Sequence, residues 1–209
     1  MKNLTASFML LLMMAAGLSA AWARGASPIG ALKDLSGKVY LIRNTEKSAA
    51  KEGMNLEEGD GIITDKDSRA TIFINEKARI VLNASTEVFL GMKFRFPVYA
   101  LESGQVRGLF DGCPAKIIIL AGDATITADN AEIDVYAERQ EKNHLIVLRG
   151  RVWWVVEKWA ARKTLPEGEH VLWDERGAMP FDDKRDDGRK KMLEWYPAKP
   201  GERGPAILP

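Results

Sequence analysis

Residues 56–76 read LEEGDGIITDKDSRATIFINE, and they decide how the chain is interpreted. The six acidic residues of this stretch, at positions 57, 58, 60, 65, 67 and 76, raise the question of a metal site. If Asp65 is the first position of an EF-hand loop, Arg69 and Ala70 fall where the loop needs an oxygen ligand and a glycine. An EF-hand is therefore excluded, although a looser calcium site in a turn stays open. Otherwise the carboxylates are interpreted as solvated turn residues between strands.

The end of the same stretch has a period of two. Apolar residues occupy every second position from 70 to 74, and again at 80 and 82, with Asn75-Glu76-Lys77 between the two runs. This pattern predicts two strands joined by a hairpin loop. A second hairpin is predicted between 124–128 and 131–136, because Asp129-Asn130 is a pair that tolerates positive φ.

Strand patterns recur along the whole central part of the chain, without long helical segments. They lie near residues 38–43, 70–74, 78–82, 87–90, 98–101, 105–109, 116–120, 124–128, 132–137, 144–148 and 151–157. This spacing predicts an all-β fold, a twisted antiparallel two-sheet sandwich or roll of about ten short strands.

Two local patterns recur at unequal intervals. A glycine stands two residues before a valine at the start of three strands, and the turn Leu56–Asp60 is echoed at 165–169 by LPEGE. A glycine at such points lets the chain turn with positive φ or lets two backbones approach closely. The residues predicted to shape turns are Gly37, Gly59, Asp60, Gly104, Gly150 and Gly168.

The order of these signals resembles the FecR domain. The first half of that domain is matched by Gly37-x-Val39, the turn at 56–60, Ile63-Thr64, Ser68-Arg69-Ala70 and the strand at 80–82. The second half is matched by Leu101-x-x-Gly104-x-Val106 and Leu148-x-Gly150-x-Val152, so the resemblance covers about residues 30–172. It implies an exported, non-catalytic β domain that interacts with other proteins of the cell envelope.

The chain also departs from that family. Asn75-Glu76-Lys77 replaces the usual Asp-Gly of the first hairpin, and Asn130-Ala131 stands where many members carry Gly-Thr. The regulators that give the family its name have a cytoplasmic segment before a membrane helix, whereas only residues 1–4 precede the apolar run here. The resemblance therefore implies the exported domain alone, without a segment that could hold a sigma factor.

The two ends of the chain are predicted to lie outside the β domain. Lys2, the apolar run at 8–18 and Ala21-Trp22-Ala23 predict a signal peptide over residues 1–23 and a periplasmic or secreted protein. The alternative is an uncleaved N-terminal helix that anchors the chain in the inner membrane. The β domain is expected over 30–173, followed by a charged, Pro-rich and mobile tail over 174–209.

Composition excludes several partners. With the signal removed, Lys plus Arg equals Asp plus Glu at 29 each, so the neutral surface gives no footprint for nucleic acid. After signal cleavage no integral membrane segment is expected. Cys113 is the single cysteine, so no intrachain disulfide can form.

The sequence offers no recognisable catalytic constellation. His144 and His170 both lie in strand-like surroundings, with no triad and no metal-ligand spacing around them, and each is interpreted as a structural histidine. No phosphate-binding glycine motif is present. We therefore expect no enzyme, no catalytic residues, no cofactor and no metal ion.

Aromatic residues supply the main indication of binding. The residues predicted to form an interaction surface are Trp153, Trp154, Trp159, Phe94 and Phe96. Strand alternation sends Trp153 and Trp159 to one face and Trp154 to the other, so at least one face is core. Phe94, Phe96 and Tyr99 suggest an apolar row on a loop or edge strand. The predicted function is a periplasmic or cell-envelope module for protein interaction or sensing; the alternative is a module that binds carbohydrate or cell-wall glycan.

Overall fold

A computed structural model describes residues 28–112, 116–138, 143–174 and 177–179 of the chain. The predicted signal peptide, Cys113 and nearly all of the predicted tail lie outside these residues. Within the described residues, no helix is long and apolar enough to cross a membrane.

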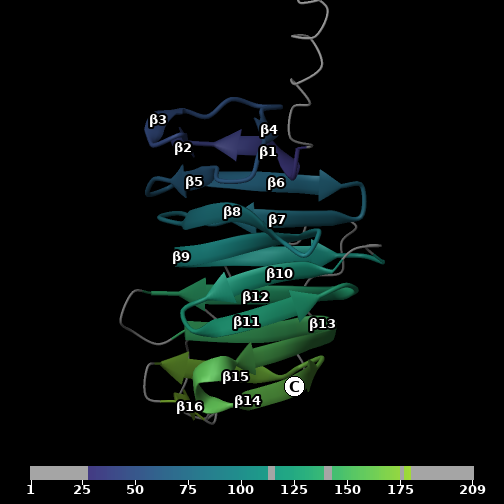
Figure 1. The fold of residues 1–209 in the computed structure, drawn as a ribbon. Coiled ribbons are helices and arrows are strands. Elements are labelled where there is room, and N and C mark those ends of the chain that lie inside the picture. Colours follow the sequence, from purple (N-terminus) through teal and green to yellow (C-terminus); the bar gives the residue numbers. More distant parts are fainter. Residues whose placement is uncertain (1–27, 113–115, 139–142, 175–176, 180–209) are drawn as a thin grey trace, which may run out of the picture.

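The described residues form sixteen strands and one short 3-10 helix, η1 (Glu157–Trp159). The strands are β1 (Gly30–Ser36), β2 (Val39–Arg43), β3 (Glu46–Ala49), β4 (Asn55–Leu56), β5 (Gly61–Thr64), β6 (Arg69–Asn75), β7 (Ala78–Leu82), β8 (Glu87–Lys93), β9 (Phe96–Phe110), β10 (Ile117–Ala121), β11 (Ala124–Ala128), β12 (Ala131–Ala137), β13 (Asn143–Val156), β14 (Ala161–Pro166), β15 (His170–Asp174) and β16 (Gly177–Met179). In Figure 1 they stack from β1–β4 at one end to β14–β16 at the other. The predicted all-β class is confirmed.

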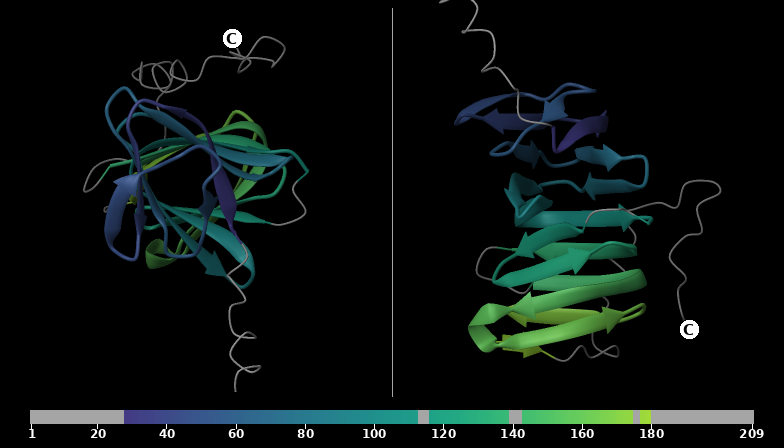
Figure 2. Two further views of the ribbon diagram at one scale, coloured as in Figure 1. Left: turned by 90° about the horizontal axis from the view of Figure 1, so that it is seen from above. Right: turned by 45° about the vertical axis from the view of Figure 1, so that its right-hand side comes forward.

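The strands belong to two sheets that face each other around the core, as the view along the stack shows (Figure 2). Sheet A has the order β4-β1-β6-β7-β9-β12-β13-β15-β16. Sheet B has the order β3-β2-β5-β8-β9-β10-β11-β13-β14. All of these pairs are antiparallel except β9 with β10, which is parallel.

Two long strands, β9 and β13, belong to both sheets. β9 pairs within sheet B up to Ser103 and within sheet A from Gly104, and β13 passes from sheet A to sheet B at Gly150. The sequence predicted two separate strands in each place, because a glycine interrupts the apolar alternation there. Instead each glycine bends one continuous strand around the edge of the sandwich. We name the two edges of the molecule the Gly104 edge and the Gly150 edge after these bends.

The hairpin predicted at 75–77 is confirmed, since β6 and β7 pair on either side of it. The hairpin predicted at Asp129-Asn130 is wrong. β11 pairs with β10 and β13 in sheet B, while β12 pairs with β9 and β13 in sheet A. The Asp-Asn pair turns the chain, as its chemistry predicts, but the turn carries the chain from one sheet to the other.

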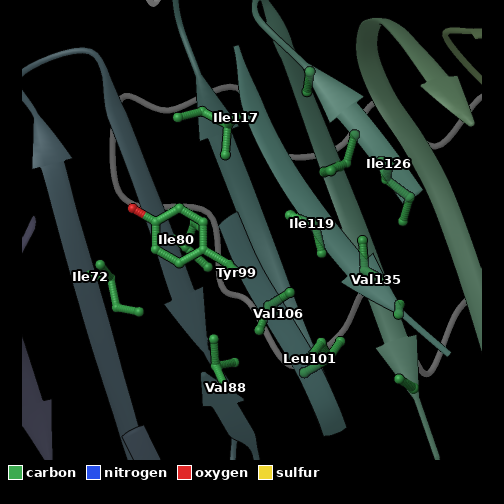
Figure 3. Packing of buried hydrophobic residues seen from close by; sticks show 14 of the residues in the cluster. Ile72, Ile80, Val88, Tyr99, Leu101, Val106, Ile117, Ile119, Ile126 and Val135 are labelled. Atoms are coloured by element: carbon green, nitrogen blue, oxygen red, sulfur yellow. The ribbon is translucent and has the colours of Figure 1, made fainter. Parts of the chain in front are cut away.

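The core fills the space between the sheets with aliphatic side chains from both. Figure 3 shows side chains from both sheets: sheet A contributes Ile72, Ile80, Val106 and Val135, and sheet B contributes Val88. Trp173 is completely buried and packs edge-on against Trp154, with ring centroids 6.0 Å apart. Burial of these alternating faces is the main force that holds the two sheets together.

Candidate functional site

The tryptophans predicted to form a surface are separated by the fold. Trp154 lies in the core with 3% of its surface exposed, whereas Trp153 points outward from sheet B and is 40% exposed. Trp159 lies in η1, so strand alternation does not continue to it, and its side chain is outside the described residues. Trp153 therefore remains as the surface tryptophan of this strand.

The predicted phenylalanine row lies at a hairpin. Phe94 is 83% exposed at the tip between β8 and β9, and Phe96, the first residue of β9, is half-buried. Tyr99 was expected in the same exposed row but is buried in the core, where its hydroxyl donates to the carbonyl oxygen of Ile29 at 3.4 Å. Alternation along β9 explains the difference, because odd and even residues face opposite sides of sheet B.

Phe96 and Trp153 belong to one apolar surface, the outer face of sheet B. Cross-strand pairing joins Val98 to Ile118 and Trp153 to Thr127 in one row. A second row joins these register partners: Phe89, Ala100, Leu120, Thr125 and Val155. Neither row contains a charged side chain from β8 to β13. We call this surface the apolar face.

Charged residues border the apolar face on its two sides. Lys93, Lys116 and Arg151 lie toward the Gly150 edge, and the ammonium of Lys116 is 5.3 Å from the centroid of the Trp153 ring. Glu87 and Glu102 lie toward the Gly104 edge. Each of these residues occupies one of the alternate positions whose side chains point away from the core. Asp129, at the next outward position after Thr127, also lies on the Gly150 side. The Gly150 side of the face therefore carries three basic residues and one acidic residue, and Glu87 and Glu102 lie on the other side.

A surface pocket of about 360 Å³ opens beside the apolar face, where β5 and β8 reach the Gly104 edge. Tyr40 and Ile63 supply its apolar wall, and Ser85, Asp65 and Glu87 supply polar groups. The ammonium of Lys47 stands 4.2 Å from the centroid of the Tyr40 ring. The pocket is therefore partly aromatic and carries more acidic than basic groups.

The glycines predicted to shape turns all have positive φ, between 75° and 93°. Three of them lie where the chain changes sheets, and a Cβ there would meet a neighbouring segment. It would stand 2.4 Å from Ser68 Oγ at Gly37, 2.5 Å from Thr86 Oγ1 at Gly104 and 2.3 Å from the Asn130 carbonyl oxygen at Gly150. These contacts explain why a glycine precedes the valine in each repeat, since only glycine combines the positive φ with the close approach.

The echoed turns at 56–60 and 165–169 share one hydrogen-bond pattern. Gly59 donates to the Leu90 carbonyl and Leu90 donates back to Asp60, and Gly168 and Glu169 exchange the same pair of bonds with Val147. Each turn also closes with a bond from its last residue to the residue three positions earlier. The two turns therefore attach to a neighbouring strand in the same way.

Asp60 corrects one prediction. Its carboxylate is 2% exposed, not solvated, and it accepts hydrogen bonds from Arg43 Nε at 2.8 Å and Nη2 at 2.7 Å and from the Glu57 amide at 2.8 Å. The hydrogen bond from Arg43 raises the pKa of that guanidinium, so its charge is retained. Asp60, predicted as a solvated turn residue, is thus committed to an ion pair and a turn.

Sequence reasoning missed a polar stripe across the outer face of sheet A. Buried Asp134 accepts from Gln105 Nε2 at 2.6 Å, and Arg107, 2% exposed, pairs with Glu132. His144 and His170 were each interpreted as a structural histidine, and the fold brings them together, with His144 Nδ1 3.3 Å from His170 Nε2. The alternation of Glu132, Asp134 and Tyr136 along the chain was the sequence signal that could have indicated this polar stripe. Among the described residues, no group of three or more His, Cys, Asp or Glu side chains is placed to hold a metal ion.

Comparison with known proteins gives a fold likeness and no family. No protein-family model matches the chain, and no curated protein matches it. A crystal structure at 1.65 Å of a proposed anti-sigma factor from Parabacteroides distasonis is similar, with a TM-score of 0.50 and 14% identity. A second structure, at 2.50 Å and under the same description, gives a TM-score of 0.49. The alignment spans 57% of this chain and 57% of the chain that it matches. At this identity the likeness concerns the fold alone.

Proposed function

We propose that this chain is a non-catalytic FecR-like module, exported to the cell envelope, that acts through protein contacts made by the apolar face. The carrying observation is the apolar face itself: two uncharged rows run across five strands and include Trp153. Apolar patches of this kind, bordered by charges, mark interaction sites on soluble proteins. Regulation by protein contact also suits the likeness to a proposed anti-sigma factor.

Glycan binding has less support than protein contact. Carbohydrate modules of the kind considered from the sequence need several indole faces open to a sugar ring, but Trp154 is in the core. One side of the Trp153 ring is approached by the Lys116 ammonium. Titration with soluble cell-wall glycans should therefore leave tryptophan fluorescence unchanged, and a saturable change would favour the glycan alternative.

Crosslinking in the producing bacterium tests the protein-contact proposal. A photoreactive amino acid would replace Thr127, in the middle of the apolar face, and in a matched control Lys51, in an exposed turn between β3 and β4. We expect defined protein adducts from position 127, in the envelope fraction, and none from position 51. If position 127 gives no adducts, or the chain remains in the cytoplasm, the proposal is wrong.

A further inference from the structure

The hairpin tip between β8 and β9 places an aromatic side chain where it is costly. Phe94 and Arg95 have φ values of 51° and 72°, the pattern of a type I′ turn, which favours Asn-Gly. The hairpin between β2 and β3 has similar values at Asn44 and Thr45, 51° and 69°, with asparagine in the first position. Phe94 is also 83% exposed, so its ring gains no burial that would offset the strain. A binding role accounts for both features.

The pocket beside the apolar face suits such a ring. It is open to solvent, and its volume of about 360 Å³ leaves room for a phenyl ring. Tyr40 and Ile63 offer apolar contact in a lining that is otherwise polar, and Asp65 and Glu87 supply its acidic groups. The tip carries Lys93 and Arg95 on either side of Phe94.

The tip and the pocket are related by their positions on one strand. Phe94 lies four residues after Leu90, and Thr86, which lines the pocket, lies four residues before it. Lys93 and Glu87 stand three residues to either side in the same way. A two-fold axis in the plane of the apolar face, perpendicular to β8 and level with Leu90, exchanges the two ends of this strand. It therefore brings the tip of each copy over the pocket of the other.

We propose that the apolar face binds a second copy of this chain, forming an isologous dimer in which Phe94 of each copy fills the pocket of the other. The proposal rests on the proposed function in taking the apolar face as a protein contact. Lys93 of one copy then meets Glu87 of the other. Because the axis closes the pair, each dimer has two tip contacts and leaves no tip free to start a filament.

The apolar face alone is smaller than a standard interface. Its five strands, β8, β9, β10, β11 and β13, at about 4.8 Å spacing and covered over about 17 Å each, give roughly 400 Å² per copy. Specific interfaces bury about 800 Å² per partner, with aromatic side chains in pockets as the dominant contacts. The two tip contacts therefore supply much of the binding.

Charge exchange provides the decisive test, because it distinguishes a second copy from any other partner. Lys93→Glu and Glu87→Lys each place like charges at both contacts, so each purified variant should show at least a tenfold weaker dimer by sedimentation equilibrium. Mixing the two variants, or combining both changes in one chain, restores opposite charges and should restore the mass of a dimer. Monomeric wild-type chain at all concentrations, or single variants whose mixture stays monomeric, would overturn the proposal.

A second variant separates strain from binding. Phe94→Asn with Arg95→Gly supplies the residues that the turn favours, so the thermal midpoint of the monomer should rise while dimerisation weakens at least tenfold. Unchanged dimerisation in this variant would show that the tip does not bind. If the chain is monomeric but position 127 still crosslinks to a different protein, the dimer is wrong and the proposed function stands. If neither occurs, both are wrong.

Discussion

At the scale of single residues, the bends of the long strands depend on glycines that no other residue can replace. Gly150→Ala places a methyl group 2.3 Å from the Asn130 carbonyl oxygen at a φ of 81°. We expect a loss of about 2–3 kcal/mol in the free energy of unfolding, measured by urea denaturation. Gly91→Ala is the matched control, because a Cβ there meets nothing within 4 Å and its φ is not positive. Its loss should stay below about 1 kcal/mol. Equal losses in the two variants would contradict this account of the bend.

The residue scale also shows where sequence reasoning succeeded and failed. The glycine repeat was visible and its positions were correct, because positive φ and close approach leave a strong local signature. The burial of Asp60 was not visible, since its partner Arg43 lies 17 residues earlier on another strand. The pairing of His144 with His170, 26 residues apart, was hidden for the same reason. Partner choice between distant strands depends on register, which a local pattern does not specify.

At the scale of elements, side-chain hydrogen bonds join successive turns along the Gly104 edge. Thr86 Oγ1 accepts a hydrogen bond from the backbone amide of Gln105 at 3.0 Å, and Thr64 Oγ1 accepts one from the backbone amide of Thr86 at 2.9 Å. Both threonines are 1% exposed, so water cannot replace these partners. The chain thereby gains a polar connection between β5, β8 and β9 where the sheets separate.

Removing one of these hydroxyl groups tests that connection. Thr86→Val keeps the shape of the side chain but leaves the buried Gln105 amide without its acceptor, so we expect a loss of about 1–3 kcal/mol in the free energy of unfolding. Thr125→Val, on the half-buried outer face of sheet B, is the control and should change it by about 0.5 kcal/mol or less. Chemical denaturation of both variants measures the difference. A loss in the control as large as that in Thr86→Val would exclude the proposed role of the hydroxyl.

The element scale separates what periodicity can predict from what it cannot. The strands at β6, β7, β11 and β12 were located correctly, because their apolar residues alternate cleanly. The predicted ranges left out seven strands: β1, β3, β4, β5, β14, β15 and β16. β3 is exposed along its length and β14 along most of it, so an apolar alternation is lacking in both. The Asp129-Asn130 turn was predicted but its partners were wrong, because the same turn chemistry serves a hairpin and a change of sheet.

At the scale of the whole molecule, β9 and β13 make the two sheets one structure. Each strand contributes hydrogen bonds to both sheets, so neither sheet can separate without breaking a continuous strand. The core is likewise one cluster that runs from Ile29 to Trp173. Small domains with a single core usually unfold in one cooperative transition. The expected consequence is that a change near one end of the stack is felt at the other.

Asp60→Ala tests this coupling across the molecule. It removes the bidentate partner of the Arg43 guanidinium and the buried acceptor of the Glu57 backbone amide near the β1–β4 end. Because the Arg43 side chain is 35% exposed, water solvates its charge, and we expect a loss of about 1–3 kcal/mol in the free energy of unfolding. Trp154 and Trp173 lie near the other end of the stack and report on it by fluorescence, while far-UV circular dichroism reports on all strands. Both signals should shift to the same lower urea concentration. Glu57→Ala, which removes a half-exposed carboxylate 3.4 Å from Arg43, is the control and should cost about 1 kcal/mol or less. If the tryptophan transition stays at its wild-type midpoint while the circular dichroism shifts, the two ends unfold independently and the long strands do not couple them.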